Sequence, residues 1–150
     1  MKILVSVEHL YPGFGGAEVY LDKFLRRLAE KHTIQVIESE GLPQASPGSR
    51  ITVETPSIPL PFRLLWYKYH SSPRWKYQFS PIMLQSICWR GIVEKKIREY
   101  APDLLLTQQN LSAASIDAAR RNNVPSVMLI HDFRNFSYSS FDTRGNLVPK

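Results

Sequence analysis

The chain has 150 residues, of which 43% are hydrophobic and 21% charged, so it carries enough apolar side chain for one globular core. Nineteen lysines and arginines against thirteen acidic residues give a formal net charge of +6, which favours an anionic ligand or a membrane surface over nucleic acid. The single cysteine, Cys88, excludes an intrachain disulfide and a C-x-x-C zinc pair. No stretch approaches the roughly 20 apolar residues of a membrane span. We therefore expect a cytoplasmic protein, at most peripheral at the inner membrane face.

The first part of the chain alternates between strand and helix patterns. Residues 2–7, KILVSV, are rich in β-branched residues and predict a strand. A helical period starts near Ala17, after a run of glycines, with apolar positions on one side at Leu21, Phe24, Leu25 and Leu28. Residues 33–38, TIQVIE, predict a second strand. Together these elements indicate a βαβ unit and the start of a parallel sheet.

The rest of the chain continues this alternation after a proline-rich stretch. Residues 51–54 are a weak strand candidate, and residues 81–100 predict a helix that begins with a well-tolerated proline. Residues 103–107 and 124–130 are mainly consecutive apolar residues, so we expect both to be strands covered on both faces. An Ala-rich helix is predicted between them, over residues 112–121. The predicted fold is α/β, a doubly wound, Rossmann-like parallel sheet with helices on both faces.

The loop between the first strand and the first helix, YPGFGGAE at residues 11–18, is the first candidate site. Ligands of doubly wound sheets bind beyond the carboxyl ends of the strands, and glycines let backbone amides approach a phosphate closely. We expect Gly15 and Gly16 to cradle a phosphate or a sugar, and Gly16 to tolerate no side chain because of that approach or a positive φ. A tight turn without a ligand is the alternative. Ala17 and Glu18 fit neither a Walker A motif nor the dinucleotide fingerprint, which argues against a nucleoside triphosphatase and a nicotinamide-dependent oxidoreductase.

The second candidate site follows the last predicted strand, at His131 and Asp132. A histidine there can act as an acid or a base, or stabilise charge that develops in a reaction. The alternative is a histidine that only caps the sheet. Asn110 lies just beyond the strand at residues 103–107, where it could contact a hydroxyl-rich ligand or cap the next helix.

Several segments together resemble one protein family. They are residues 12–18, PGFGGAE, residues 100–103, YAPD, residues 123–125, NVP, and residues 131–133, HDF. With the opening strand and helix, they are similar to the amino-terminal domain of GT-B glycosyltransferases. The closest group is the large retaining family that acts on nucleotide sugars, glycosyl transferase group 1, or family 4. The chain departs from that family at residues 107–110, TQQN, where the family often has His-x-His.

The resemblance implies a division of labour between two domains. Residues 1–150 would be the acceptor-side half of the GT-B architecture, and the donor-binding second domain, with its Glu-x7-Glu motif, is absent from this chain. The complete enzyme would transfer a hexosyl group from a nucleotide-sugar donor to a saccharide or lipid-linked acceptor, with no metal and no cofactor. The isolated domain is expected to be inactive.

The resemblance also implies roles for the candidate residues. Gly15 and Gly16 would approach the donor phosphates from across the cleft, and His131 would support a transition state with oxocarbenium character. Asn110 and Asp132 are the candidate acceptor contacts. A non-enzymatic sugar- or nucleotide-binding module is the alternative, because a fold alone does not decide function. A reading frame that continues into a second domain would favour the enzyme.

Residues 62–79 interleave aromatic and basic side chains without an acidic residue. At a bilayer surface the rings could settle at headgroup depth while the cations meet anionic lipid. A lipid-linked acceptor would give such a segment a purpose. The alternative is that the aromatic side chains pack on the sheet or against the second domain. Nucleic acid is not an expected partner, because nothing else in the chain resembles an oligonucleotide-binding fold.

Overall fold

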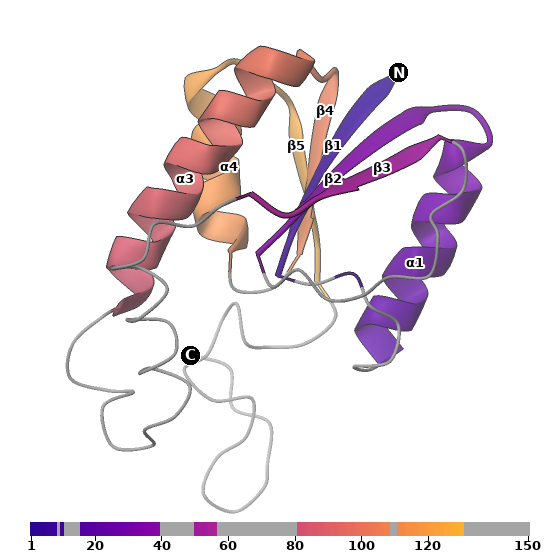
Figure 1. Ribbon diagram of the computed structural model, residues 1–150, viewed down its shortest axis with the longest axis horizontal. Helices are drawn as coiled ribbons and strands as arrows, with labels where there is room; N and C mark the ends of the chain where they lie inside the picture. Colours follow the sequence, from indigo (N-terminus) through magenta and orange to yellow (C-terminus); the bar gives the residue numbers. More distant parts are fainter. Residues whose placement is uncertain (9, 11–15, 40–49, 57–80, 109–110, 131–150) are drawn as a thin grey trace, which may run out of the picture.

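A parallel sheet of five strands lies at the centre of the computed structural model (Figure 1). The structure describes residues 1–8, 10, 16–39, 50–56, 81–108 and 111–130, without the side chains of residues 81–86. The strands are β1 (Lys2–Val7), β2 (Thr33–Glu38), β3 (Ile51–Glu54), β4 (Leu104–Gln108) and β5 (Ser126–Leu129). The described helices are α1 (Gly16–Ala29), α3 (Pro81–Tyr100) and α4 (Ser112–Arg121).

The chain builds the sheet outward from β1 first on one side and then on the other. The sheet has the order β3-β2-β1-β4-β5, and every pair of neighbours is parallel. The chain therefore moves outward from β1 to β3 and then returns to add β4 and β5 on the other side. All carboxyl ends lie at one edge of the sheet, toward the bottom of Figure 1. This arrangement confirms the predicted doubly wound fold and puts its switch point between β1 and β4.

The two faces of the sheet carry separate cores, because successive side chains of a strand point to opposite sides. Helix α1 packs on one face, where Val5, Leu21 and Leu106 belong to one buried cluster. Helices α3 and α4 cover the other face, where Leu4 and Leu105 belong to a second cluster (Figure 1). Burying one leucine side chain of this kind stabilises the fold by about 1.5–3 kcal/mol.

The burial of β5 differs from the sequence-based expectation, and that expectation was wrong. The strand spans Ser126–Leu129 rather than residues 124–130, and Val127 is 45% exposed. Among the described strands, β5 pairs with β4 alone, so it forms an edge of the described sheet. A run of apolar residues does not by itself predict cover on both faces, because that cover depends on neighbours supplied by the tertiary fold.

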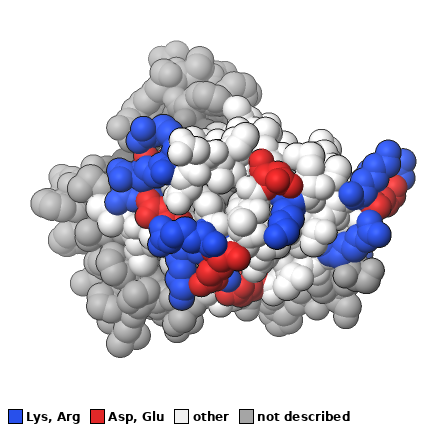
Figure 2. Space-filling view, turned by 90° about the horizontal axis from the view of Figure 1, so that it is seen from above, with Lys and Arg blue, Asp and Glu red and all other residues white. Residues whose placement is uncertain are grey.

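The amino ends of the strands are joined by exposed polar contacts. Asp103 was predicted as the first residue of a strand, but it precedes β4 and accepts a hydrogen bond from the Lys2 backbone N–H at 2.7 Å. The Tyr100 hydroxyl donates to the carbonyl oxygen of Thr33 at 3.1 Å. Seen from this end, basic and acidic side chains lie in mixed groups (Figure 2). The positive charge of the described chain therefore forms no separate patch on this face.

Candidate substrate-binding edge

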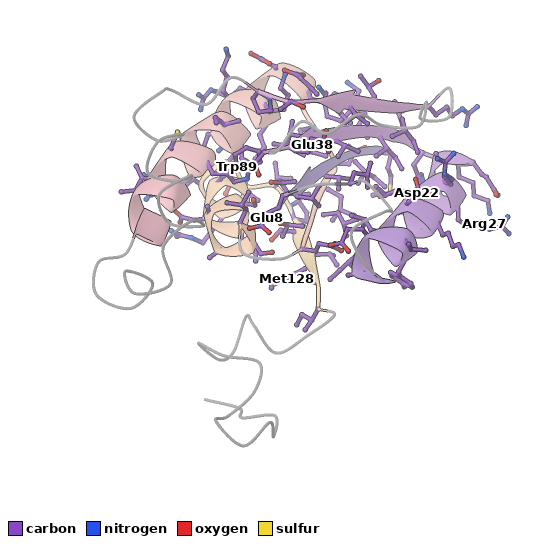
Figure 3. All side chains as sticks on the ribbon, turned by 60° about the horizontal axis from the view of Figure 1, so that its bottom comes forward. Glu8, Asp22, Arg27, Glu38, Trp89 and Met128 are labelled. Atoms are coloured by element: carbon purple, nitrogen blue, oxygen red, sulfur yellow. The ribbon has the colours of Figure 1, made fainter. Side chains whose placement is uncertain are left out.

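Buried polar side chains gather at the carboxyl edge of the sheet. In the described chain, the buried polar and charged residues are Ser6, Glu8, Glu18, Glu38, Thr107, Gln108, Ser112 and Ser115. Each lies near or just beyond the carboxyl end of a strand, or in the first turn of α1 or α4. Figure 3, which turns this edge toward the reader, shows Glu8 and Glu38 at the ends of neighbouring strands. Ligands of doubly wound folds bind at this edge.

A directed chain of hydrogen bonds joins the central strands to α3 and α4. The Trp89 indole Nε1 donates to the Ser6 hydroxyl at 2.9 Å, and the hydroxyls of Ser6 and Ser115 are 2.8 Å apart. Ser115 in turn donates to the carbonyl oxygen of Leu111 at 2.8 Å, so its hydroxyl accepts from Ser6. Because the hydroxyls of Ser6 and Ser115 are buried and hydrogen-bonded, the network fixes the start of α4 against β1.

The outer sides of α3 and α4 are joined by charges around Asp117. Its carboxylate accepts hydrogen bonds from Arg120 at 2.8 Å, from Arg121 at 2.9 Å and from Arg90 of α3 at 3.2 Å. The hydrogen bond from Arg120, followed by that from Arg121, lowers the pKa of Asp117 to about 2. Asp117 therefore keeps its negative charge, and its bonds to both helices, well into the acidic range.

The residues that lead into the glycine loop are held by the end of β2. The Glu38 carboxylate accepts a hydrogen bond from the Leu10 backbone N–H at 3.2 Å and lies 3.4 Å from the Thr55 hydroxyl. The backbone N–H of Ser39 donates to the carbonyl oxygen of Glu8 at 3.0 Å. These contacts extend the pairing of β1 and β2 beyond the strands and fix the direction in which the chain leaves β1.

Gln108 is a buried polar residue that the sequence-based site prediction did not include. Its side chain has 0% exposure, and neither Nε2 nor Oε1 has a hydrogen-bond partner in the described part of the chain. A signal was present in the sequence, because an uncharged polar residue follows the apolar run of β4 at the predicted ligand edge. The missing hydrogen-bond partners, however, could be recognised only in the structure.

Gly16 is the first residue of α1, and its backbone is helical. Its φ is not in the positive region, so a positive φ is not a reason for glycine at this position, and that part of the expectation was wrong. A Cβ atom built on Gly16 would meet no atom of the described residues within 4 Å. The described part of the fold therefore gives no steric reason for glycine at this position.

The other predicted site residues, Gly15, Asn110, His131 and Asp132, lie outside the described residues, as do residues 62–79. The N-cap position of α4 is occupied by Leu111 rather than Asn110. No group of three or more His, Cys, Asp or Glu side chains in the described segments is arranged to hold a metal ion. Within the same segments, no helix is long and apolar enough to cross a bilayer.

Solved structures with the same fold come from more than one class of protein. Os79 from O. sativa, crystallised with UDP and deoxynivalenol-3-glucoside, has a TM-score of 0.55 and 12% identity, over 85% of this chain and 28% of that one. The Streptomyces sp. SF2575 glycosyltransferase SsfS6, complexed with thymidine diphosphate, has a TM-score of 0.51 and 18% identity, over 85% and 38%. A deacetylase in complex with teicoplanin has a TM-score of 0.51 and 14% identity, over 84% and 68%. At sequence identities this low, the structural similarity establishes the fold and not the function.

The chain thus spans less than two fifths of the length of Os79 or SsfS6. No curated protein sequence matches it. The family assignment comes from a match to the sequence model of Glycosyltransferase Family 4 over residues 14–146, a range that includes Gly15, Gly16 and His131. With that match and an α/β sheet of the GT-B type, the chain belongs to glycosyltransferase family 4.

Proposed function

We propose that this chain is the acceptor-side, amino-terminal domain of a retaining glycosyltransferase. The complete enzyme transfers a hexosyl group from a nucleotide sugar to a saccharide or lipid-linked acceptor. The observation that carries the proposal is the gathering of buried polar side chains at the carboxyl edge, in a chain of glycosyltransferase family 4. Among the described residues, those polar residues that are buried as a whole lie at this edge, whereas at the amino end a single polar atom, Nδ1 of His32, is buried without a partner.

The start of α1 is the proposed contact for the donor phosphates. A helix N-terminus presents free backbone N–H groups and a partial positive charge, both of which favour an anion. Gly16 stands at that end, and no atom of the described residues lies within 4 Å of the position that a Cβ would take, which supports a close approach of a phosphate oxygen to its backbone. Gly15 is assigned the same role. The nucleotides in the solved structures, UDP with Os79 and thymidine diphosphate with SsfS6, support a nucleotide-sugar donor.

His131 is the proposed catalytic residue, because it follows Ile130 beyond the carboxyl end of β5. In the transfer, the bond from the anomeric carbon to the phosphate oxygen breaks, the bond to the acceptor oxygen forms, and the proton of the acceptor hydroxyl passes to the departing diphosphate. The sugar ring carries positive charge between these events. A polar group aimed at the ring stabilises that charge or the hydroxyls around it. Asn110 and Asp132 are the proposed acceptor contacts.

Residues 62–79 are proposed to contact an anionic membrane that carries the acceptor. Vesicle co-sedimentation tests this role, since binding should rise with the fraction of anionic lipid and fall with salt. Replacing Arg74 and Lys76 with alanine should weaken binding. If vesicle binding does not depend on the fraction of anionic lipid, residues 62–79 instead pack within the protein.

The experiment for the proposed function uses the full-length protein with a panel of nucleotide sugars and saccharide or lipid-linked acceptors. The expected result is transfer of one hexosyl group with release of a nucleoside diphosphate, and a product whose anomeric configuration matches that of the donor. Residues 1–150 alone should show no transfer. Nucleotide-sugar binding without release of nucleoside diphosphate would identify a non-enzymatic binding module instead.

A further inference from the structure

Gln108 ends β4 with a fully buried side chain that has no polar partner in the described chain. Its exposure is 0%, and neither the amide nitrogen nor the amide oxygen is hydrogen-bonded. A buried amide without partners costs free energy, and nearly all such groups in native proteins are satisfied by protein, water or ligand. The amide of Gln108 therefore requires a partner that the described chain does not provide.

The neighbours of Gln108 within the sheet are apolar. Gln108 pairs with Leu129 of β5, and it points to the same face as Leu106, which belongs to the core under α1. Val7, at the end of the adjacent strand β1, belongs to that core as well. No side chain among these three can donate to, or accept from, the amide.

The preceding residue shows how the chain satisfies a polar side chain at the same strand end. Thr107 points to the opposite face, where its hydroxyl donates to the carbonyl oxygen of Ser6 at 2.8 Å and lies 3.3 Å from the Ser112 hydroxyl. The hydrogen bonds of Thr107 are complete, whereas those of Gln108 are open. The open amide lies beside the switch point between β1 and β4, where ligands bind in doubly wound sheets.

We infer that Gln108 is a specificity-determining residue that binds hydroxyl groups of a sugar substrate; this inference rests on the proposed function. A neutral amide offers two N–H donors and a carbonyl acceptor in one plane. Adjacent sugar hydroxyls, each of which donates and accepts, can satisfy all of them. A phosphate group only accepts hydrogen bonds, so it would leave the carbonyl oxygen of the Gln108 amide without a donor and next to an anion. Because the amide does not titrate, its contribution is independent of pH.

The test replaces Gln108 with methionine in the full-length protein, which keeps the length of the side chain and removes its polar atoms. Thermal unfolding of the free protein is measured together with kcat and KM for donor and acceptor. We expect the Tm of Gln108→Met to equal or exceed that of wild type, because an unpartnered amide is removed. We expect kcat/KM to fall about 10- to 100-fold, as for the loss of two neutral hydrogen bonds. The substrate whose KM rises is the one that Gln108 binds.

Gln35 offers a matched control on β2. Its amide Nε2 donates to the Glu54 carboxylate at 3.1 Å, so Gln35→Met should lower Tm and leave kcat/KM unchanged. Monodeoxy analogues of the responding substrate give a second test. The analogue that lacks the contacted hydroxyl should have a low kcat/KM with the wild-type enzyme. The Gln108→Met variant should lower the kcat/KM of this analogue little further, because both changes remove the same contact.

A Gln108→Met protein with a lower Tm than wild type would overturn the inference, since the amide would then have a structural partner. An unchanged kcat/KM would overturn it as well. A wild-type protein that transfers no sugar refutes the proposed function instead, and binding then decides the role of Gln108. In that case, UDP-glucose or methyl α-glucoside must raise the Tm of wild type more than that of Gln108→Met, and equal shifts count against the inference.

Discussion

At the amino end of the sheet, the polar side chains of Lys2, Tyr100 and Asp103 form exposed contacts, whereas at the carboxyl end several polar side chains are buried. The exposed contacts of Lys2, Tyr100 and Asp103 join strand starts and helix ends, and the core between them is apolar. The buried groups at the other end include a complete network around Ser6 and an open amide at Gln108. We therefore expect substitutions in the apolar core to change mainly stability, and substitutions at the carboxyl edge to change the proposed binding of substrates.

The largest effect on stability is expected from the apolar core. Leu105 in β4 is fully buried, so Leu105→Ala should lower the free energy of unfolding by about 2–5 kcal/mol through lost burial and a cavity. Urea denaturation measures this change. Val127→Ala on the exposed side of β5 is the control and should cost much less. Equal losses at the two positions would mean that β5 is as well covered as β4.

The largest effect on activity is expected at the carboxyl edge. In the full-length protein, His131→Ala should reduce sugar transfer by roughly 10²-fold or more, because a positioned acid, base or charge stabiliser contributes at least that much. Its Tm should stay close to that of wild type. Normal turnover by a folded variant would remove His131 from the proposed site.

Gly16→Val tests the start of α1. Because a Cβ atom at this position meets no atom of the described residues within 4 Å, the Tm should change little. The donor KM should rise about 10-fold, the equivalent of one hydrogen bond to a charged group, since the side chain occupies the path of a phosphate. If the donor KM and kcat stay normal, phosphate is bound elsewhere.

Trp89→Phe probes the satisfied network at the same edge. The variant loses the bond from Nε1 to the Ser6 hydroxyl, which should cost about 1 kcal/mol of stability and leave KM for both substrates near normal. A double-mutant cycle with Ser6→Ala measures the coupling directly. Zero coupling would contradict a hydrogen bond that contributes to stability.

The smallest effect is expected from the protonation of Asp117, which occurs only in acid. Its pKa is lowered from the usual 3.8 to about 2, so the unfolded chain binds more protons than the folded one in this range. The contribution of the ionised Asp117 carboxylate to the free energy of unfolding is therefore complete above about pH 4, and it is lost as the pH falls toward 2. Unfolding measured across this range should show a weaker pH dependence in Asp117→Asn. An unchanged dependence would place the responsible carboxylate elsewhere.

Most elements could be predicted from the sequence because their patterns are local. Apolar residues at helical spacing predicted α1, where Leu21 and Leu25 are buried, and residues 33–38 and 51–54 are the observed strands β2 and β3. The glycine loop and the polar residues after the predicted strands also pointed to the carboxyl edge of the sheet, where the buried polar side chains of the described chain lie. These inferences need only the periods of helices and strands and the rule that parallel strands end together.

Two features could not be predicted because they depend on neighbours distant in the sequence. The apolar run in β5 resembles that of β4, yet Val127 remains exposed, since the strand order leaves β5 at an edge of the described sheet. Thr107 and Gln108 are adjacent polar residues with the same sequence signal. Only the tertiary structure brings hydroxyl and carbonyl partners to one face of β4 and apolar side chains to the other, and this difference leaves the amide of Gln108 open.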